Sequence, residues 1–209
     1  MSASDTERIL CFPRQLLSEH LDHAEVFCDE TLLDRILANI RVTNRQAAEH
    51  DYSLKQLVVY TLVTSGDRYL VYWRTHRSSE ERLRQLYSIG IGGHVNVMDE
   101  SRLGVDGREL LVGAVWRELK EEISIRSKVL HGPELTAFIN DDTNDVGRVH
   151  FGTVWTLEIA EPAAELRGES GLGRIAFHDL AGLEVMKPDF EQWSQLLIES
   201  LAARRRSEW

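Results

Sequence analysis

Acidic residues are crowded into the stretch RELKEEISI, residues 117–125. The three acidic residues, Glu118, Glu121 and Glu122, lie within five consecutive positions. On a helix each residue turns by about 100°, so the three carboxylates would share one face, within an arc of roughly 100°. Like charges at these spacings destabilise a helix by about 0.2–0.5 kcal/mol per pair. A stable fold therefore has to offset the repulsion among these carboxylates.

A bound divalent cation would offset this repulsion. The apolar residues earlier in this segment fall on an overlapping arc of the helix, so we expect the carboxylates to point inward: Leu110, Leu111, Ala114 and Val115. Burying unpaired carboxylates is costly, whereas Mg²⁺ or Mn²⁺ prefers carboxylate oxygens and keeps waters and substrate phosphates as further ligands. The alternative is a solvated face of a charged helix, which most charge runs are.

The elements around this helix are predicted from hydrophobic patterns. Residues 56–74 form two β-branched and aromatic runs that flank a Ser-Gly-Asp turn signal, a pattern typical of a hairpin. The run at residues 86–95 carries three glycines, which in a strand mark bulges or the close approach of another backbone or a ligand. Helices are predicted at 110–125 and 190–203, and strands at 134–139 and 148–159.

Together these elements predict an α/β fold in which helices pack on a central mixed sheet as a sandwich. At 209 residues the chain fits one domain with an extension. We assign residues 56–209 to the domain and residues 1–55 to a helical N-terminal extension, whose apolar spacing in DETLLDRILANI matches a helix. The extension is expected to cover a sheet face, to close the substrate mouth or to pair two subunits as a homodimer.

Composition excludes several classes of function. The formal charge of −10 argues against stable binding to nucleic acid or to anionic lipid. No apolar run approaches the roughly 18 residues of a membrane span, and the polar start lacks the features of a secretory signal, so we expect a cytoplasmic protein. The two cysteines and the histidines show no metal-ligand spacing, and the sequence predicts no zinc site.

The acidic stretch resembles the signature of the Nudix (MutT-like) hydrolases, G-x5-E-x7-R-E-U-x-E-E-x-G-U, where U is aliphatic. Glu109 is followed by seven residues and then by Arg117, Glu118 and the two further glutamates at their signature positions. Gly92 and Gly93 correspond to the glycines that open the signature. The strand and helix order resembles the family from about residue 56 to residue 203.

Two departures from the signature stand out. Fifteen residues separate Gly93 from Glu109 where the pattern has five, so this loop carries an insertion inside the Nudix box. The late glycine of the signature is Ser124 here, which bears on how the helix ends.

The resemblance implies an α/β/α sandwich that hydrolyses the phosphoanhydride bond of a nucleoside diphosphate derivative or a similar small molecule with Mg²⁺ or Mn²⁺. By position, Glu118, Glu121 and Glu122 become metal ligands, Arg117 orients Glu118, and the carbonyl of Gly92 is a further candidate ligand. The base that activates water is either Glu118 or one of three acids in a downstream loop, which are also typical turn formers: Asp141, Asp142 and Asp145.

An anionic substrate of an acidic protein needs local cations or amides. The candidates flank the hairpin and the glycine pair: Arg74, Arg77, Gly93 and His94. For each of the two arginines and for His94 taken singly, the sequence favours an exposed solubilising residue. Two other functions are compatible with the fold: a non-catalytic Nudix-like module that binds a nucleotide and regulates another process, and a prenyl diphosphate isomerase. The intact acidic signature disfavours the first, and the lack of a cysteine in the strand region disfavours the second.

Overall fold

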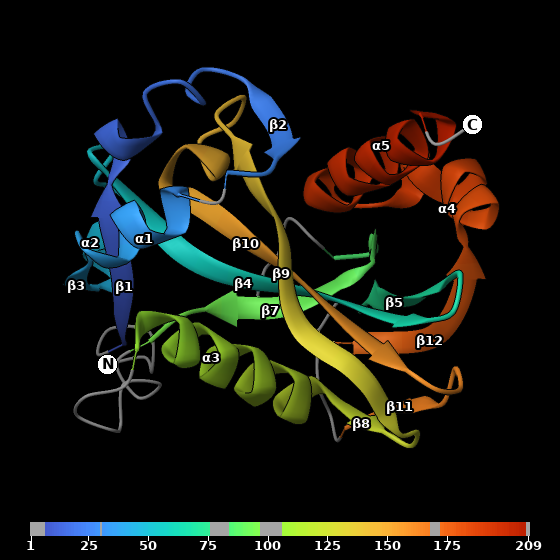
Figure 1. Ribbon diagram of the computed structural model, residues 1–209. Coiled ribbons are helices and arrows are strands. Elements are labelled where there is room, and N and C mark those ends of the chain that lie inside the picture. The colour runs from blue at the N-terminus through green and yellow to red at the C-terminus, as the bar shows by residue number, and fades with distance from the viewer. Residues whose placement is uncertain (1–6, 30, 76–83, 97–105, 168–171, 208–209) are drawn as a thin grey trace. The chain divides into compact units, whose positions relative to one another are not determined.

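The computed structural model describes residues 7–29, 31–75, 84–96, 106–167 and 172–207. The chain has a mixed α/β fold, as predicted, with a large sheet and several helices (Figure 1). It divides into two compact units. The first comprises Met1–Tyr60, Gly92–Trp116 and Thr136–Val154, and the second comprises Thr61–Ile91, Arg117–Leu135 and Trp155–Trp209.

Several elements contribute residues to both units, because the chain passes from one unit to the other inside them. They are β4 (Leu54–Ser65), β7 (Gly90–His94), α3 (Gly107–Glu122), β9 (Val129–Asp141) and β10 (His150–Ile159).

The first unit contains most of the N-terminal elements. They are β1 (Arg8–Pro13), the 3-10 turn η2 (Arg14–Leu17), β2 (Ala24–Phe27), α1 (Leu32–Leu37), β3 (Arg41–Asn44) and α2 (Arg45–Ala48), and η5 (Gly147–Val149) lies in the same unit. In this unit β4 has β10 and β1 as neighbours, β9 lies beyond β10, and β2 pairs with β9. Strand β1 also pairs antiparallel with β3, from Arg8 opposite Asn44 to Cys11 opposite Arg41.

The N-terminal 55 residues therefore contain more strand than the sequence indicates. The predicted helix is present as α1, but it spans six residues and buries only Leu32, Leu33 and Ile36. Strand β1 buries Ile9, Leu10, Cys11 and Phe12 in succession. An uninterrupted apolar run of this length does not show the alternation by which a half-buried strand is recognised.

Gly92 confirms the prediction that a strand glycine marks a close backbone approach. A Cβ at this position would overlap the carbonyl oxygen of Val59 in the neighbouring strand β4. We expect Gly92→Ala to destabilise the protein by at least about 1–3 kcal/mol, because the backbone of β4 must move. The matched control is Gly113→Ala on the exposed side of α3, where a Cβ meets no atom within 4 Å.

Chemical unfolding measures both variants. The control should gain about 0.5–1 kcal/mol, since alanine favours a helix interior over glycine. Equal unfolding midpoints for the two variants would contradict this explanation of Gly92.

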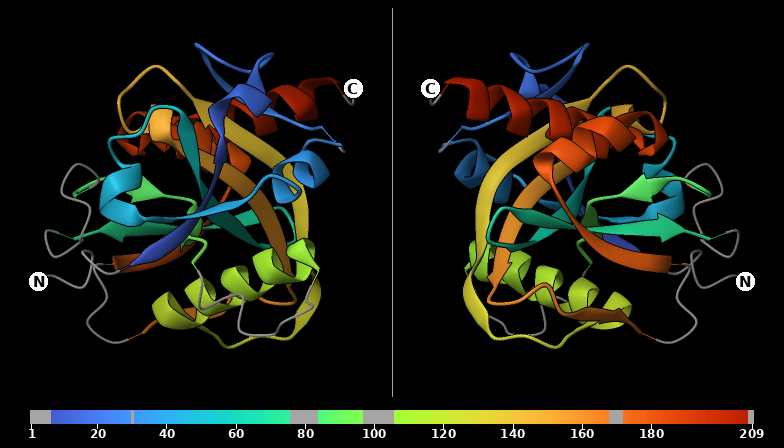
Figure 2. Two further views of the ribbon diagram at one scale, coloured as in Figure 1. Left: turned by 90° about the vertical axis from the view of Figure 1, so that its left-hand side faces the viewer. Right: turned by 90° about the vertical axis from the view of Figure 1, so that its right-hand side faces the viewer.

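The second unit holds the predicted hairpin and the C-terminal elements. They are β5 (Arg68–Arg74), β6 (Tyr87–Ser88), β8 (Ile123–Ile125), β11 (Ala164–Leu166), β12 (Leu172–Asp179), α4 (Leu180–Met186), η6 (Lys187–Asp189) and α5 (Gln192–Ser207). The hairpin is confirmed, with Thr64 opposite Tyr69 and Ser65 opposite Arg68 around the turn. Strand β5 also pairs with β12, and helices α4 and α5 lie side by side (Figures 1 and 2).

The C-terminal helix is confirmed, although it begins two residues later than predicted. The carboxylate of Glu191, which is buried, precedes the helix and accepts hydrogen bonds from the backbone N–H groups of Trp193 (2.8 Å) and Ser194 (2.9 Å). These are first-turn donors without intrahelical partners, so Glu191 caps the helix and fixes its start.

Helix α3 ends at Glu122, and residues 123–125, predicted as helix, form strand β8. Ser124 stands where the signature has glycine, and it pairs with Glu165 of β11. The guanidinium of Arg167 donates to the Ser124 hydroxyl (2.8 Å) and to the Lys120 carbonyl (3.1 Å). An arginine thus satisfies a terminal carbonyl of α3, and a strand follows directly without a left-handed glycine.

Candidate functional site

The three signature glutamates differ in exposure at the C-terminal end of α3. Glu118 is buried, at 9% of its full exposure, and Glu122 is half-buried. The side chain of Glu121 is 59% exposed. The prediction of an inward face is therefore confirmed for Glu118 and wrong for Glu121, because the arc that they share straddles the boundary between protein and solvent.

Arg117 holds the buried carboxylate. Its guanidinium donates to Glu118 at 2.6 Å and lies 3.7 Å from a carboxylate oxygen of Glu121. Burial raises the pKa of Glu118, Arg117 opposes this shift, and the charges of Glu121 and Glu122 raise the pKa further. The C-terminal end of α3 thus carries three carboxylates, and the guanidinium of Arg117 pairs with two of them.

The charge of Glu122 also acts on a buried tyrosine of the same unit, Tyr72. The hydroxyl of Tyr72 donates to the carbonyl of Gly90 (2.7 Å) and accepts from the guanidinium of Arg74 (2.8 Å). Burial raises the pKa of Tyr72, Arg74 lowers it, and the charges of Glu191 and Glu122 raise it. Arg74, a predicted substrate contact, is half-buried and holds Tyr72, with its guanidinium 5.3 Å from the centre of that ring.

The remaining predicted site residues lie elsewhere in the chain. Gly92, Gly93 and His94 belong to β7 in the first unit, where His94 packs against the ring of His150. Arg77 lies outside the described residues, as do residues 97–105, the larger part of the inserted loop.

The downstream acids are engaged by their own loop and its neighbours. Asp141 accepts hydrogen bonds from the backbone N–H and the hydroxyl of Thr143 and from the amide of Asn144, which confirms the turn interpretation for Asp141. Asp142 is buried in ion pairs with Lys55 and Arg14, both at 2.6 Å. The side chain of Asp145 is 84% exposed and lies 3.8 Å from the guanidinium of Arg148.

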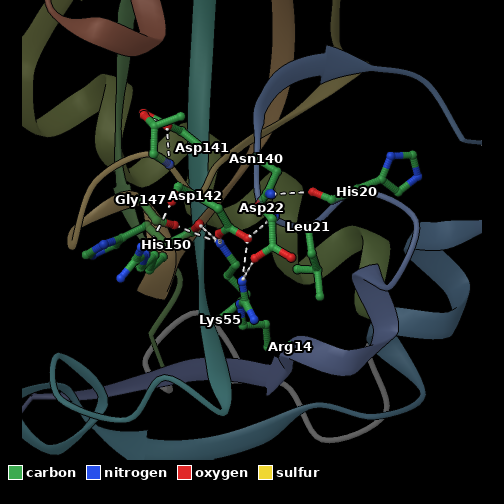
Figure 3. Close-up of polar contacts among 12 residues, drawn as sticks. Arg14, His20, Leu21, Asp22, Lys55, Asn140, Asp141, Asp142, Gly147 and His150 are labelled. Carbon is green, nitrogen blue, oxygen red and sulfur yellow. Dashed lines mark hydrogen bonds and ion pairs between the residues drawn. The ribbon is translucent and has the colours of Figure 1, made fainter.

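Lys55 is a buried charged residue that the sequence analysis did not identify. Its side chain is fully buried, and the ammonium donates to Asp142 (2.6 Å) and to the carbonyls of Gly147 (2.7 Å) and His150 (3.3 Å) (Figure 3). Burial lowers the pKa of Lys55 to about 8, and the contact with Asp142 opposes this shift. A lysine near the start of β4, just ahead of the apolar run of that strand, was the available signal in the sequence for such a pair.

The carboxylates at the end of α3 form a donor set that fits a hard divalent cation. All three are oxygen donors, and a bound cation would offset the repulsion of Glu118 by the negative charges of Glu121 and Glu122. Glu121 stays accessible to solvent, which leaves room for waters and substrate oxygens in the shell of an ion. Glu118, Glu121 and Glu122 are thus three oxygen donors of the second unit, of the kind that a hard divalent cation prefers.

Comparison with known proteins adds relatives of the whole chain. No model of a known protein family matches the sequence. Protein YmaB of Bacillus subtilis is 29% identical over 205 residues, which cover 93% of this chain and 97% of YmaB. The crystal structure of Tm1382, described as a putative Nudix hydrolase, matches with a TM-score of 0.74 and 27% identity, and covers 93% of this chain and 98% of its own.

A second solved structure shares the fold at lower similarity. The Nudix domain of Shewanella oneidensis NrtR, crystallised with ADP ribose, matches with a TM-score of 0.52 and 17% identity, and covers 72% of this chain and 88% of its own.

Within the described part of the chain, none of the helices combines the length and hydropathy that crossing a membrane requires.

Proposed function

We propose that this chain is a Nudix hydrolase and that it cleaves the pyrophosphate bond of a nucleoside diphosphate derivative with the help of Mg²⁺ or Mn²⁺. The observation that supports this proposal is the arrangement at the end of α3. Arg117 lies 2.6 Å from buried Glu118, and burial together with the charges of Glu121 and Glu122 raises the pKa of Glu118. The likeness of Tm1382 over nearly the whole chain also supports the proposal.

When bound, the cation would supply neutralisation of the charge on the phosphate oxygens. The chain would supply positioning. Arg117 would fix the orientation of Glu118 through its ion pair, and Glu121 would offer a carboxylate that solvent and substrate can reach. The carbonyl of Gly92 is a proposed further ligand, and Arg74, Arg77 and Gly93 stay predicted substrate contacts.

For the general base we propose Glu118. Burial and its acidic neighbours raise its pKa, and a carboxylate with a raised pKa is a stronger base toward water. Asp141 and Asp142 are less suited: Asp141 is held in a turn, and Asp142 lies between two cations, Lys55 and Arg14, and has a pKa that is lowered and not raised. A water placed in line with the leaving group completes the requirement for phosphoanhydride cleavage.

The test is turnover of a panel of nucleoside diphosphate derivatives, including ADP ribose, with Mg²⁺ or Mn²⁺ in ¹⁸O-labelled water. We expect ¹⁸O in one phosphate-containing product and loss of turnover when EDTA removes the cation. ADP ribose belongs in the panel because the Nudix domain of NrtR binds it. Binding without turnover across the panel would instead support the non-catalytic module.

Arg117 gives a graded prediction. Arg117→Met should lower kcat/KM by about 10–100-fold, the range for residues that orient a metal ligand. Arg117→Lys keeps the charge without the planar fork, so it should recover part of that loss. Steady-state kinetics and Mn²⁺ binding check both variants. A merely structural role would leave the Mn²⁺ dissociation constant unchanged in the two variants and would contradict the assignment.

A small-molecule phosphoanhydride is the proposed partner, and the cytoplasmic location and the homodimer stay predictions. Gel filtration with light scattering measures the oligomeric state directly.

A further inference from the structure

Three side chains that no sequence spacing connects meet in the first unit. Glu49 follows α2, His94 ends β7 and His150 begins β10. One ligand atom from each lies within 4.8 Å of the other two. The two histidine Nε2 atoms are 3.0 Å apart, and a carboxylate oxygen of Glu49 lies 3.8 Å from Nε2 of His150.

The tautomer of His150 is set by its other nitrogen. Its Nδ1 lies 2.7 Å from the carbonyl oxygen of Val146, and a carbonyl can only accept, so Nδ1 carries the hydrogen. In neutral His150 the lone pair is then on Nε2, the atom that faces His94. A backbone carbonyl that orients a histidine through the non-ligating nitrogen is the usual support of a metal-binding imidazole.

The loop that carries this carbonyl is held in place. Gly147 N–H donates to the side chain of Asn144 (2.9 Å), and its carbonyl accepts from buried Lys55 (2.7 Å). Lys55 is also 3.3 Å from the carbonyl of His150 and is paired with Asp142, so its charge is balanced beside the histidine (Figure 3). His150 is therefore fixed before any ligand arrives.

We propose that His94, His150 and Glu49 bind a transition-metal ion of the Zn²⁺ class. Two imidazoles and one carboxylate are a donor set that suits Zn²⁺ and its neighbours in the first row, whereas Mg²⁺ prefers oxygen ligands alone. Two nitrogens bound to tetrahedral zinc at 2.0–2.1 Å lie about 3.3 Å apart, close to the spacing of these Nε2 atoms.

Access and charge fit the same ion. His150 is buried, but the side chain of Glu49 is 35% exposed, so the carboxylate can close on an ion that enters from solvent. Three protein ligands leave a fourth position open for water or another small ligand. This role for His94 replaces the phosphate contact predicted from the sequence, and it connects the N-terminal segment to β7 and β10 through one ion.

The experiment uses the full chain in a large excess of Mg²⁺, which occupies the oxygen-donor site. Zn²⁺ binding is measured by calorimetry, and Co²⁺ is added as a spectroscopic substitute. We expect one tight Zn²⁺ per chain, a visible Co²⁺ absorption band typical of a four-coordinate site, and a higher Tm with Zn²⁺.

Two variants remove a ligand each. His94→Ala and Glu49→Gln should each weaken Zn²⁺ binding at least about tenfold and reduce the Co²⁺ band. The matched control is His131→Ala, an exposed histidine of the second unit, which should bind as the parent protein does. Far-UV circular dichroism of the metal-free variants checks folding, and Glu49→Gln serves if His94→Ala does not fold.

Two results would overturn the proposal. Zn²⁺ binding that is unchanged in both variants would place the ion elsewhere. Absence of Zn²⁺ binding by the parent chain under excess Mg²⁺ would mean that the two histidines form a hydrogen-bonded pair and nothing more. Either result is distinguishable from failure of the proposed hydrolase, because no readout depends on turnover.

Discussion

Glu118→Gln is expected to lower kcat/KM for pyrophosphate hydrolysis by about 10²–10³-fold or more. The substitution keeps the shape of the side chain and removes the charge that Arg117 contacts and that the proposed cation would contact. The loss of one preorganised electrostatic contact to a transition state has about this effect. Glu122→Gln should give a comparable loss. Steady-state kinetics with saturating Mg²⁺ measure the effect.

The control for this prediction is Glu165→Gln in the second unit. Glu165 is 64% exposed and pairs with Arg126 at 2.9 Å, so its substitution removes a carboxylate of the same kind from the surface. Activity of this control should equal that of the parent chain. Glu118→Gln with folded structure and parental kcat/KM would exclude Glu118 from both of its proposed roles.

Breaking the buried pair of Lys55 and Asp142 should have the largest effect on stability. Lys55→Met leaves Asp142 buried with Arg14 as its ion-pair partner in the described contacts, and Asp142→Asn leaves a buried ammonium without its carboxylate. Each substitution is expected to lower the free energy of unfolding by about 3–5 kcal/mol, because it leaves the other member of the pair buried without its counter-charge. The free energy of unfolding in urea measures the loss.

The double variant carries the sharper test. Combining Lys55→Met with Asp142→Asn should cost less than the sum of the two single losses by about 0.5–3 kcal/mol, because neither member of the Lys55–Asp142 pair is then left buried without the other. The exposed pair of Arg126 and Glu165 is the matched control and should contribute at most about 1 kcal/mol. Additive losses at the buried pair would show that the two charges do not stabilise one another.

The sequence predicted those parts of the fold whose signals are local. The hairpin of β4 and β5 has its turn residues between two β-rich runs, and both C-terminal and acidic helices have apolar residues at helical spacing. Strand β1 could not be recognised in this way, because its partners β3 and β4 lie far along the chain and its apolar residues do not alternate. Strand β12 was missed as well, although it extends the hairpin.

The same contrast holds for the sites. The glutamates of α3 are close in sequence, so spacing and resemblance together indicated them. Lys55 and Asp142 are 87 residues apart, and His94 and His150 are 56 residues apart, so no local spacing announces either pair. A charged residue in an apolar strand was the available signal for Lys55, and no comparable signal exists for the histidines.

Binding of Mn²⁺ to the end of α3 tests the central claim most directly. Free Mn²⁺ is counted by electron paramagnetic resonance during titration of the chain, in a His94→Ala background that removes the histidine site. The account predicts that this protein binds Mn²⁺ and that adding Glu118→Gln weakens the binding at least about tenfold with the fold retained. Equal Mn²⁺ affinity with and without the Glu118 carboxylate would contradict it.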